Sequence, residues 1–448
     1  MKATVDISEV KGKVSVPSSK SLTIRALMCA ALSRGESEIS NPLVSDDTNA
    51  AAAVLEKIGV GIVKDNNVWR VSGGKLRMPV GDIDCGESAT TMRFLTAIIA
   101  LVPGEHRLVG GPMLTKRPIR PLVEALARLG VKGATAGKTT PPVTITGGTF
   151  TGGATLIEGN VSSQYISALL LLAPFSKTAT SIKLTTPLTS RPYVLMTIWC
   201  LKQFGINVTV GANRFLVKRQ RYQPAKVNVE GDWSTASYFL ALGAISEEGI
   251  QIENLKTASF QGDRVMLDFL RGMGAAVRVS GDTVTVSRNR LRAINADLSD
   301  CIDLLPTLAV LAALAEGQSV FVGVGRARIK ESNRVAAVKD GLLKMGVNVV
   351  EQGDRLAITG LKIAKKPVME DEEDAGETSP AQPGAAATPP KEPVVIDSYG
   401  DHRIAMAFAV LGASLGGITI DGAECVTKTF PGFWEAFAGI GGKIRKHE

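Results

Sequence analysis

The sequence has few aromatic residues, few histidines and no clustered cysteines. Aromatic side chains make up 5% of the 448 residues, so the chain offers few surfaces on which nucleic-acid bases could stack. Its five cysteines lie far apart without a CxxC pair, and only three histidines could complement them. This pattern argues against a zinc site and against a disulfide framework. We therefore expect reduced thiols, no metal and a cytoplasmic protein.

Long apolar runs and a secretion signal are also missing. The longest apolar stretch, LLPTLAVLAALA, is too short to span a bilayer, and the N-terminal segment MKATVDISEVKGKVSV alternates like a strand. What the chain has is a hydrophobic content of 45% and a net charge of +8. These values predict a globular protein of two or three domains with anionic partners, either small molecules or nucleic acid.

A short signature returns six times along the chain: Leu or Phe, two residues, an apolar residue and then Gly. Its copies end at Gly59, Gly130, Gly205, Gly274, Gly346 and Gly441. By subtraction these glycines are 71, 75, 69, 72 and 95 positions apart, so the last interval holds an insertion. The insertion, at about 366–395, is acidic, then rich in Pro and Ala, and free of aromatic residues. This composition predicts a solvated, unfolded loop without a catalytic role.

Each unit has the pattern of an apolar helix, a strand led by Gly, a second helix that ends at the signature glycine, and a β-hairpin. This is a βαβαββ-type unit. The sixth copy stops at GGKIRKHE, while the chain begins with strands before its first helix, so the head of the chain is expected to complete the tail. We predict two domains of three units each, 19–228 and 1–18 plus 229–448, with a hinge near residues 18 and 228.

Polar segments precede the first helix of every unit. They read SSKSLTIR, GESATTMR, VSSQYIS, GDWSTAS, DCIDLLP and YGDHRIAM. A helix start exposes unpaired N–H groups and the positive end of a dipole, so six such starts aimed at one cleft would bind anions. In the last segment Asp401 is a candidate N-cap, and Arg403 is expected to face the ligand. The starts of the second helices add cations that are either solvated or offset by a bound anion: Lys116, Arg117, Arg191, Lys330, Arg334 and Lys428.

These segments, with TKRPIRPL, SRPYV, RIKESNR and TKTFPGFW, follow the order typical of one family. Over nearly its whole length the chain resembles the 5-enolpyruvylshikimate-3-phosphate synthases, also called 3-phosphoshikimate 1-carboxyvinyltransferases. The resemblance implies an α/β fold of two domains, an inside-out α/β barrel whose six βαβαββ repeats, three per domain, close over a central cleft. It also implies transfer of the enolpyruvyl group of phosphoenolpyruvate to the 5-hydroxyl of shikimate 3-phosphate, with phosphate released and no metal or organic cofactor.

The resemblance also implies which residues bind the two substrates. For phosphoenolpyruvate it indicates Lys20, Ala89, Arg117, Gln164, Arg334, Arg403 and Lys428. For shikimate 3-phosphate it indicates Lys20, Ser21, Arg25, Ser162, Ser163, Gln164, Ser190, Tyr193, Asp303 and Lys330. Taken one at a time, the serines would be ordinary helix caps and the cations solvated surface groups.

The transfer needs a base for the hydroxyl proton and an acid that protonates the methylene carbon. The resemblance indicates Asp303 as the base, although a capping role fits its position at a helix start equally well. Glu331 and Lys20 are expected to share proton transfer at the carbon. A structural ion pair with Arg334 is the alternative for Glu331. His402 is a third titrating candidate.

Three positions depart from the commoner residues of the family. Glu87 stands where Asn is usual, Ala89 stands where many members have Gly, and Arg326 replaces an Asn. The β-carbon of Ala89 is expected to project toward the phosphoenolpyruvate pocket. A longer competitor such as glyphosate should therefore clash there more than the substrate does.

Two alternatives stay open. A UDP-N-acetylglucosamine enolpyruvyl transferase would share the fold and the donor, but that family typically has a reactive Cys where this chain reads GGPMLTKRPIRP. An RNA-binding or RNA-end-processing protein would fit the positive charge, but the charge is spread along the chain and aromatic residues are scarce. We expect small anionic substrates, no nucleic-acid or membrane partner, and a monomer.

Overall fold

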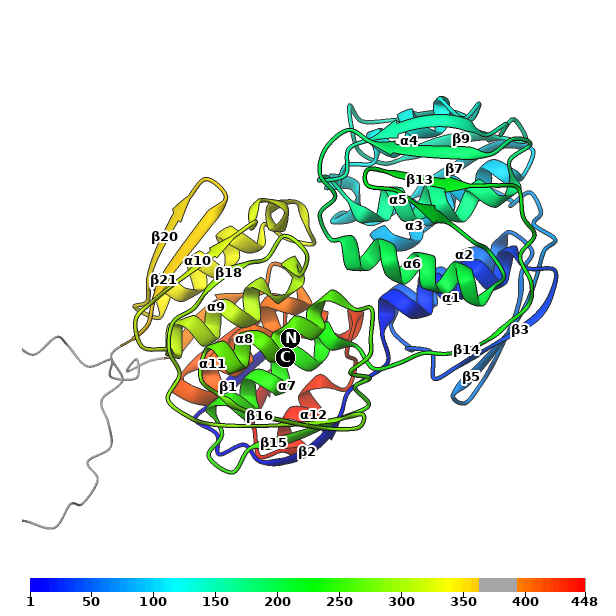
Figure 1. Ribbon diagram of the computed structural model, residues 1–448. Coiled ribbons are helices and arrows are strands. Elements are labelled where there is room, and N and C mark those ends of the chain that lie inside the picture. Colours follow the sequence, from blue (N-terminus) through cyan, green and yellow to red (C-terminus); the bar gives the residue numbers. More distant parts are fainter. Residues whose placement is uncertain (362–392, 448) are drawn as a thin grey trace, which may run out of the picture.

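The computed structural model describes residues 1–361 and 393–447, which fold into two lobes (Figure 1). Each lobe has its own hydrophobic core. One core is built from residues between 22 and 229, and the other joins residues between 3 and 16 to residues between 233 and 440. Two chain segments connect the lobes, and an isolated bridge between Ser18 and Gly231 ties these segments together.

The first lobe contains three four-stranded sheets. Its helices are α1 (Lys20–Leu32), α2 (Asp46–Lys57), α3 (Ala89–Ile98), η1 (Ile99–Leu101), η2 (Leu114–Lys116), α4 (Arg120–Ala127), α5 (Ser163–Leu172), η3 (Ala173–Phe175) and α6 (Arg191–Gln203). Its strands, in sheet order, are β14 (Lys226–Asn228), β3 (Gly35–Ser40), β5 (Val68–Gly73) and β4 (Gly61–Asp65); β6 (Ile83–Asp84), β7 (Gly104–Val109), β9 (Val143–Gly147) and β8 (Lys132–Thr135); and β10 (Gly153–Ile157), β11 (Thr180–Leu184), β13 (Arg214–Val217) and β12 (Thr209–Val210).

The second lobe repeats the arrangement with three further sheets. Its helices are α7 (Trp233–Ile245), η4 (Gly262–Val265), α8 (Met266–Gly272), η5 (Ile302–Leu304), α9 (Leu305–Leu314), η6 (Gly325–Ile329), α10 (Arg334–Lys344), α11 (His402–Leu415), η7 (Ala423–Lys428) and α12 (Phe433–Gly439). Its strands, in sheet order, are β2 (Gly12–Ser15), β15 (Ile250–Glu253), β17 (Thr283–Ser287) and β16 (Ala276–Ser280); β18 (Asn295–Asp297), β19 (Gln318–Val322), β21 (Arg355–Thr359) and β20 (Asn348–Gln352); and β22 (Val394–Asp397), β23 (Ile418–Asp421), β1 (Lys2–Asp6) and β24 (Lys443–His447).

One topology recurs in all six sheets, which confirms the predicted βαβαββ repeats. In the fifth unit, β18 pairs parallel with β19 across α9, and the hairpin β20–β21 returns antiparallel onto β19. Strands distant in sequence take equivalent places elsewhere: β14 leads the first sheet and β2 the fourth. The N-terminal strand β1 lies between β23 and β24 and completes the last sheet. The chain termini therefore lie close together (Figure 1).

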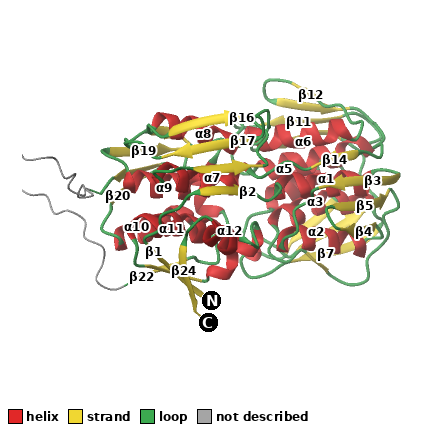
Figure 2. Ribbon diagram, turned by 90° about the horizontal axis from the view of Figure 1, so that it is seen from below, coloured by secondary structure: helices red, strands yellow, loops and turns green. Residues whose placement is uncertain are grey.

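The helices gather inside each lobe and the sheets lie toward its outside, as Figure 2 shows. The reason lies in the sequence: a helix that is apolar all round must be buried on every side. In α9, LPTLAVLAAL, every residue except the last is buried. Strands such as β17 instead alternate buried residues with partly exposed ones, because one face of the sheet meets solvent. In the described ranges, none of the helices has the length and apolar character that crossing a membrane requires.

The signature glycines end the second helix of each unit, as the pattern predicted. All six have positive φ, for example +93° at Gly59 and +95° at Gly441, a backbone region that favours glycine after a helix end. The predicted insertion at about 366–395 lies outside the described residues apart from its end. There β22 begins at Val394.

Candidate active site

A cavity lies between the two lobes, and both lobes line it. Five of the six first helices, α1, α3, α5, α9 and α11, have their starts at this cavity. The expectation that all six would do so is wrong for α7. Its N-cap Asp232 accepts a hydrogen bond from the backbone N–H of Thr235 (2.9 Å), and Ser234 donates to the buried carboxylate of Asp263. The polar groups at that helix start therefore bond to one another and not to the cavity, although Oδ1 of Asp263 has no hydrogen-bond partner among the described residues.

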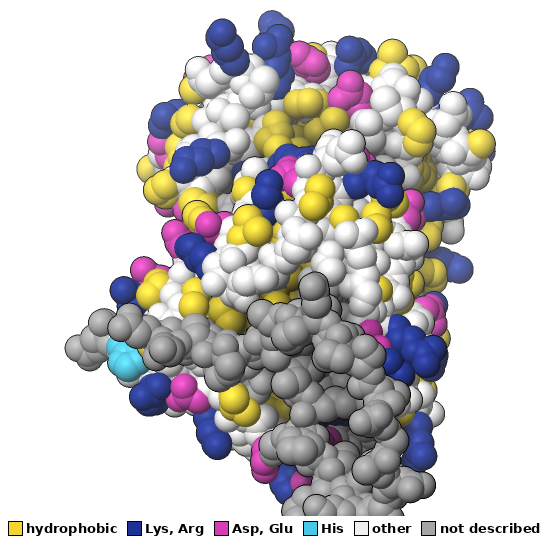
Figure 3. Space-filling view, turned by 90° about the vertical axis from the view of Figure 1, so that its left-hand side faces the viewer, with side chains coloured by type: hydrophobic (Ala, Val, Ile, Leu, Met, Phe, Trp, Pro, Cys, Tyr) yellow, Lys and Arg dark blue, Asp and Glu magenta, His cyan; other side chains and the backbone are white. Residues whose placement is uncertain are grey.

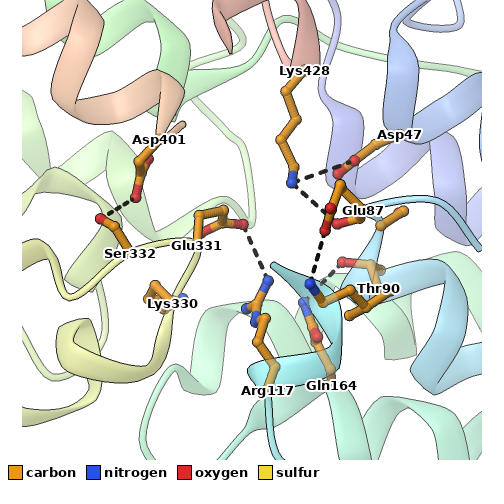
Figure 4. Close-up of polar contacts among 12 residues, drawn as sticks. Asp47, Glu87, Thr90, Arg117, Gln164, Lys330, Glu331, Ser332, Asp401 and Lys428 are labelled. Atoms are coloured by element: carbon orange, nitrogen blue, oxygen red, sulfur yellow. Dashed lines mark hydrogen bonds and ion pairs between the residues drawn. The ribbon is translucent and has the colours of Figure 1, made fainter. Parts of the chain in front are cut away.

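Every residue predicted to bind substrate or to act in catalysis lines the cavity, with the exception of Lys428. The Nζ atom of Lys428 is 3.1 Å from the backbone oxygen of Glu87 and 3.9 Å from Oδ1 of Asp47, which does line the cavity (Figure 4). Lys428 comes from the second lobe, whereas Glu87 and Asp47 come from the first. The ammonium group of Lys428 therefore links the second lobe to the first at the edge of the cavity.

Asp303 is surrounded by cations. Its Oδ1 accepts a hydrogen bond from Arg334 (2.6 Å) and lies 3.2 Å from Nζ of Lys330, while Oδ2 accepts from the hydroxyl of Tyr193 (3.0 Å). Burial alone would raise the pKa of this carboxyl, but Arg403 and the other cations outweigh burial and hold the pKa well below its ordinary value. The side chain makes no capping bond at the start of α9, so the capping alternative is wrong.

Arg334 links three carboxylates and is 1% exposed. Besides Asp303, its guanidinium donates to Oδ2 of Asp401 (2.7 Å) and to Oε2 of Glu331 (2.6 Å). Burial would lower the pKa of Arg334, but these carboxylates outweigh it and raise the pKa above its ordinary value. Asp401 also accepts from the backbone N–H of Arg403 (3.0 Å), which confirms it as the N-cap of α11.

Glu331 connects the two lobes. Its carboxylate pairs with Arg334 in its own lobe and with Arg117 of the other (3.3 Å; Figure 4). The ion pair with Arg334, the alternative to a catalytic role, is therefore present. Burial would raise the pKa of Glu331, but Arg334 and Arg117 outweigh it and hold the pKa well below its ordinary value. Glu331 is thus ionised at neutral pH.

His402 is buried at the start of α11 and lines the cavity. Within the described part of the chain, neither ring nitrogen has a hydrogen-bond partner. Burial, with the positive charges of Arg403 and Lys20, lowers the pKa of this imidazole well below its ordinary value. The ring is therefore neutral at physiological pH.

Asp47 is a site residue that sequence reasoning missed. Its Oδ2 accepts a hydrogen bond from Nζ of Lys20 (2.8 Å), and the carboxylate is almost completely buried. The surrounding segment, SDDTNAA, has the composition of an ordinary helix start, and Ser45 with Thr48 forms a capping box there. The pairing of Asp47 with Lys20 depends on tertiary structure, so it could not be predicted from the local sequence.

The opposite wall of the cavity carries two arginines that are buried without a carboxylate partner among the described residues. Arg25 donates to the backbone oxygen of Ser21 and to the hydroxyl of Thr197, both at 2.8 Å, and burial lowers its pKa to about 10. Arg93, which the sequence did not single out, donates to Oε1 of Gln164 (2.5 Å). Buried unpaired cations at a cavity wall are suited to an anionic ligand.

Glu87 and Ala89, two of the positions that depart from the commoner residues of the family, have different surroundings. The carboxylate of Glu87 accepts hydrogen bonds from the backbone N–H groups of Met113 (3.2 Å) and Leu114 (2.8 Å). Glu87 therefore fixes the segment that leads to Arg117. Ala89 is the first residue of α3, is 4% exposed and lines the cavity.

The fold is a two-lobed α/β architecture with a cation-lined cavity between the lobes. The sequence model of the family described as EPSP synthase (3-phosphoshikimate 1-carboxyvinyltransferase) matches residues 5–437, and the chain belongs to this family. It is therefore an enolpyruvyl transferase of the shikimate pathway. The comparisons favour neither the UDP-N-acetylglucosamine enzyme nor an RNA-binding protein.

The relatives match along almost their whole length. The chain is 46% identical over 450 residues to the 3-phosphoshikimate 1-carboxyvinyltransferase of Dehalococcoides mccartyi, covering 100% of both chains. It is 36% identical to that of Methanocaldococcus jannaschii, covering 97% of both. Among solved structures, EPSP synthase from Acinetobacter baumannii matches with a TM-score of 0.78 at 27% identity, covering 100% of this chain and 99% of that one.

Proposed function

We propose that the cavity between the lobes is the active site, in which the enolpyruvyl group of phosphoenolpyruvate passes to the 5-hydroxyl of shikimate 3-phosphate. The observation that carries the proposal is the ionised carboxylate of Asp303, held among lysine and arginine groups at the cavity wall. The two substrates together carry two phosphates and two carboxylates. Such a set of anions needs several cationic donors to offset its repulsion.

Asp303 is the proposed acceptor of the hydroxyl proton. Its depressed pKa keeps the carboxyl ionised, which is the form a base requires. When the substrate anions engage Lys330 and Arg403, these cations stabilise the Asp303 carboxylate less, so its pKa rises toward the range in which it can accept a proton. As the proton leaves, the hydroxyl oxygen forms a bond to C2 of phosphoenolpyruvate.

Lys20 is the proposed donor of the proton that C3 of phosphoenolpyruvate gains in the same addition. Its ammonium group is paired with Asp47, whereas Glu331 is held in its ionised form by Arg117 and Arg334. The addition gives a tetrahedral intermediate with a methyl group. Glu331 and Lys20 then share removal of a methyl proton, while the C2–O bond to phosphate breaks and the double bond reforms. The neutral ring of His402 shapes the wall beside them.

The remaining cavity residues divide between the two substrates. The proposed phosphoenolpyruvate subsite consists of Lys20, Ala89, Arg117, Gln164, Arg334, Arg403 and Lys428. The proposed shikimate 3-phosphate subsite consists of Lys20, Ser21, Arg25, Ser162, Ser163, Gln164, Ser190, Tyr193, Asp303 and Lys330. The support is that all but Lys428 line one cavity, and that Lys428 reaches its edge.

The lobes are proposed to be the functional domains, 19–228 and 1–18 plus 229–448, because each has a separate core. We propose further that the chain works as a monomer in the cytoplasm and binds no nucleic acid. On the face drawn in Figure 3, Lys and Arg side chains are dispersed among other types. A nucleic-acid site would instead gather them in a continuous stripe.

The test is release of phosphate by the purified protein from phosphoenolpyruvate with either shikimate 3-phosphate or UDP-N-acetylglucosamine as acceptor. We expect release with shikimate 3-phosphate alone. Release with the nucleotide sugar, or with neither acceptor, would overturn the proposal.

A further inference from the structure

Thr427, in η7 of the second lobe, contacts the first lobe at a point outside the cavity wall. Its hydroxyl donates to Oδ2 of Asp46 (2.8 Å), the first residue of α2, and neither residue lines the cavity. The following residue on each side forms a second contact, because Nζ of Lys428 lies 3.9 Å from Oδ1 of Asp47 (Figure 4). Two adjacent residues of one lobe therefore meet two adjacent residues of the other.

The two contacts differ in their relation to the substrate. Asp47 is paired with Lys20 and Lys428, two cations that the proposed function assigns to phosphoenolpyruvate. An anion bound to these ammonium groups competes with Asp47 for them, so it weakens the attraction of Lys428 to the first lobe. The bond between Thr427 and Asp46 involves no cation of the cavity, so the substrate does not compete for it.

The hydroxyl of Thr427 has one proton and two acceptors within reach. Besides Asp46, the backbone oxygen of Glu424 lies 3.0 Å from the hydroxyl oxygen, within η7 itself. The bond to the Asp46 carboxylate is charge-assisted and therefore the stronger of the two. If the lobes separate, the hydroxyl still donates to Glu424, and the exposed Asp46 carboxylate is hydrated. The contact can therefore form and break without leaving a buried polar group unpaired.

A bond at Thr427 also restrains Lys428, because the two residues are neighbours at the end of η7. The side chain of Lys428 is long and flexible, and its Nζ reaches the backbone oxygen of Glu87 in the first lobe (3.1 Å). A binding site with cations from both lobes is complete only in the fraction of molecules whose lobes are correctly apposed. The apparent dissociation constant of the ligand rises as that fraction falls.

We propose that Thr427 is a positioning residue for phosphoenolpyruvate, which bonds to Asp46 across the lobe junction and so holds Lys428 at the edge of the cavity. The proposal rests on the proposed function of the cavity. Thr427 does not line the cavity, so its effect on binding is exerted through Lys428.

The test is a double-mutant cycle on KM for phosphoenolpyruvate at saturating shikimate 3-phosphate, with Thr427→Val, Asp46→Ala and the double variant. Thr427→Ser is the conservative variant, because it keeps the hydroxyl. Thr149→Val is the matched control. Thr149 is exposed, donates to the backbone oxygen of Thr146 (3.4 Å) within its own lobe, and does not line the cavity.

We expect Thr427→Val and Asp46→Ala each to raise KM for phosphoenolpyruvate about three- to tenfold, the effect of losing one hydrogen bond at an exposed position. The value of kcat should stay within about twofold of wild type, because saturating substrate restores the complete site. The double variant should match the single variants, because all three lack the same bond. Thr427→Ser and Thr149→Val should match wild type.

Additive effects in the double variant would overturn the proposal, because the two residues would then act separately. A wild-type KM in Thr427→Val would do the same, and so would a KM in Thr427→Ser as high as in Thr427→Val. Should Thr427→Val fail to fold, Asp46→Ala compared with Asp46→Asn, which keeps an acceptor oxygen, provides the same test.

The proposed function is tested separately by phosphate release from the wild type with shikimate 3-phosphate. An active wild type with an unchanged KM in the variants would overturn the role of Thr427 alone. A wild type that releases no phosphate would overturn the proposed function and the role of Thr427 with it.

Discussion

Replacing Asp401 by Asn should destabilise the second lobe, and the contacts of Asp401 give the magnitude. The carboxylate is fully buried. Oδ1 caps α11 at the N–H of Arg403 (3.0 Å) and also accepts from Nη2 of Arg334 (3.3 Å). Oδ2 accepts from Nε of Arg334 (2.7 Å) and from the hydroxyl of Ser332 (3.0 Å). Asn has a single side-chain oxygen, so with this oxygen at the cap it keeps only the longer Arg334 contact and loses the shorter contact with Nε of Arg334 and the bond from Ser332.

The expected loss follows from what Arg334 retains. A hydrogen bond to a charged group contributes about 1.5–3 kcal/mol, and breaking a buried ion pair costs about 3–5 kcal/mol. Because Asp303 and Glu331 still neutralise Arg334, we expect Asp401→Asn to lower the free energy of unfolding by about 2–3 kcal/mol. Asp401→Ala should lose about 1 kcal/mol more, since the cap is lost as well.

The assay is urea denaturation at neutral pH, followed by tryptophan fluorescence. The control is Asp340→Asn, which breaks an exposed pair with Lys344 (2.9 Å) and should change the stability by less than about 0.5 kcal/mol. If Asp401→Asn were no less stable than Asp340→Asn, the reasoning about the buried network would be refuted.

Three further predictions follow from the site. Glyphosate should inhibit the wild type weakly and Ala89→Gly more strongly, because Ala89 lines the cavity; potent inhibition of the wild type at low phosphoenolpyruvate would contradict this. The folded-state pKa of Asp303 is depressed, so its contribution to stability is present above an unfolded-state pKa of about 4 and is lost as pH falls through the folded value. Stability measured below pH ~4 should therefore fall less steeply for Asp303→Asn than for the wild type. Shikimate 3-phosphate should close the lobes by neutralising cations that face each other across the cavity, and small-angle scattering unchanged by saturating ligand would exclude such closure.

The repeats could be predicted from the sequence because each depends on local signals. A glycine that must adopt positive φ after a helix marks every unit, and helices that are apolar all round mark the interior. The pairing of β1 with β23 followed from the incomplete sixth unit. Such features need no knowledge of distant contacts.

The site was harder to predict where partners are distant in sequence. The start of α7 has the same polar composition as the others, but Ser234 donates to Asp263 there, and no local signal shows this contact. Asp47 and Lys20 form their pair through tertiary packing. The carboxylate of Glu87 was recognisable as a departure, but its bonds to the segment before Arg117 could be seen only in the structure.

The most direct test of the account is a single-turnover measurement with Asp303→Asn. If Asp303 accepts the hydroxyl proton, product formation should fall by about 10²–10⁴-fold, the usual contribution of general base catalysis. Shikimate 3-phosphate should bind at least as tightly as to the wild type, because Lys330, Arg334 and Arg403 lose a competing anion. Turnover within about tenfold of the wild type would contradict the role assigned to Asp303.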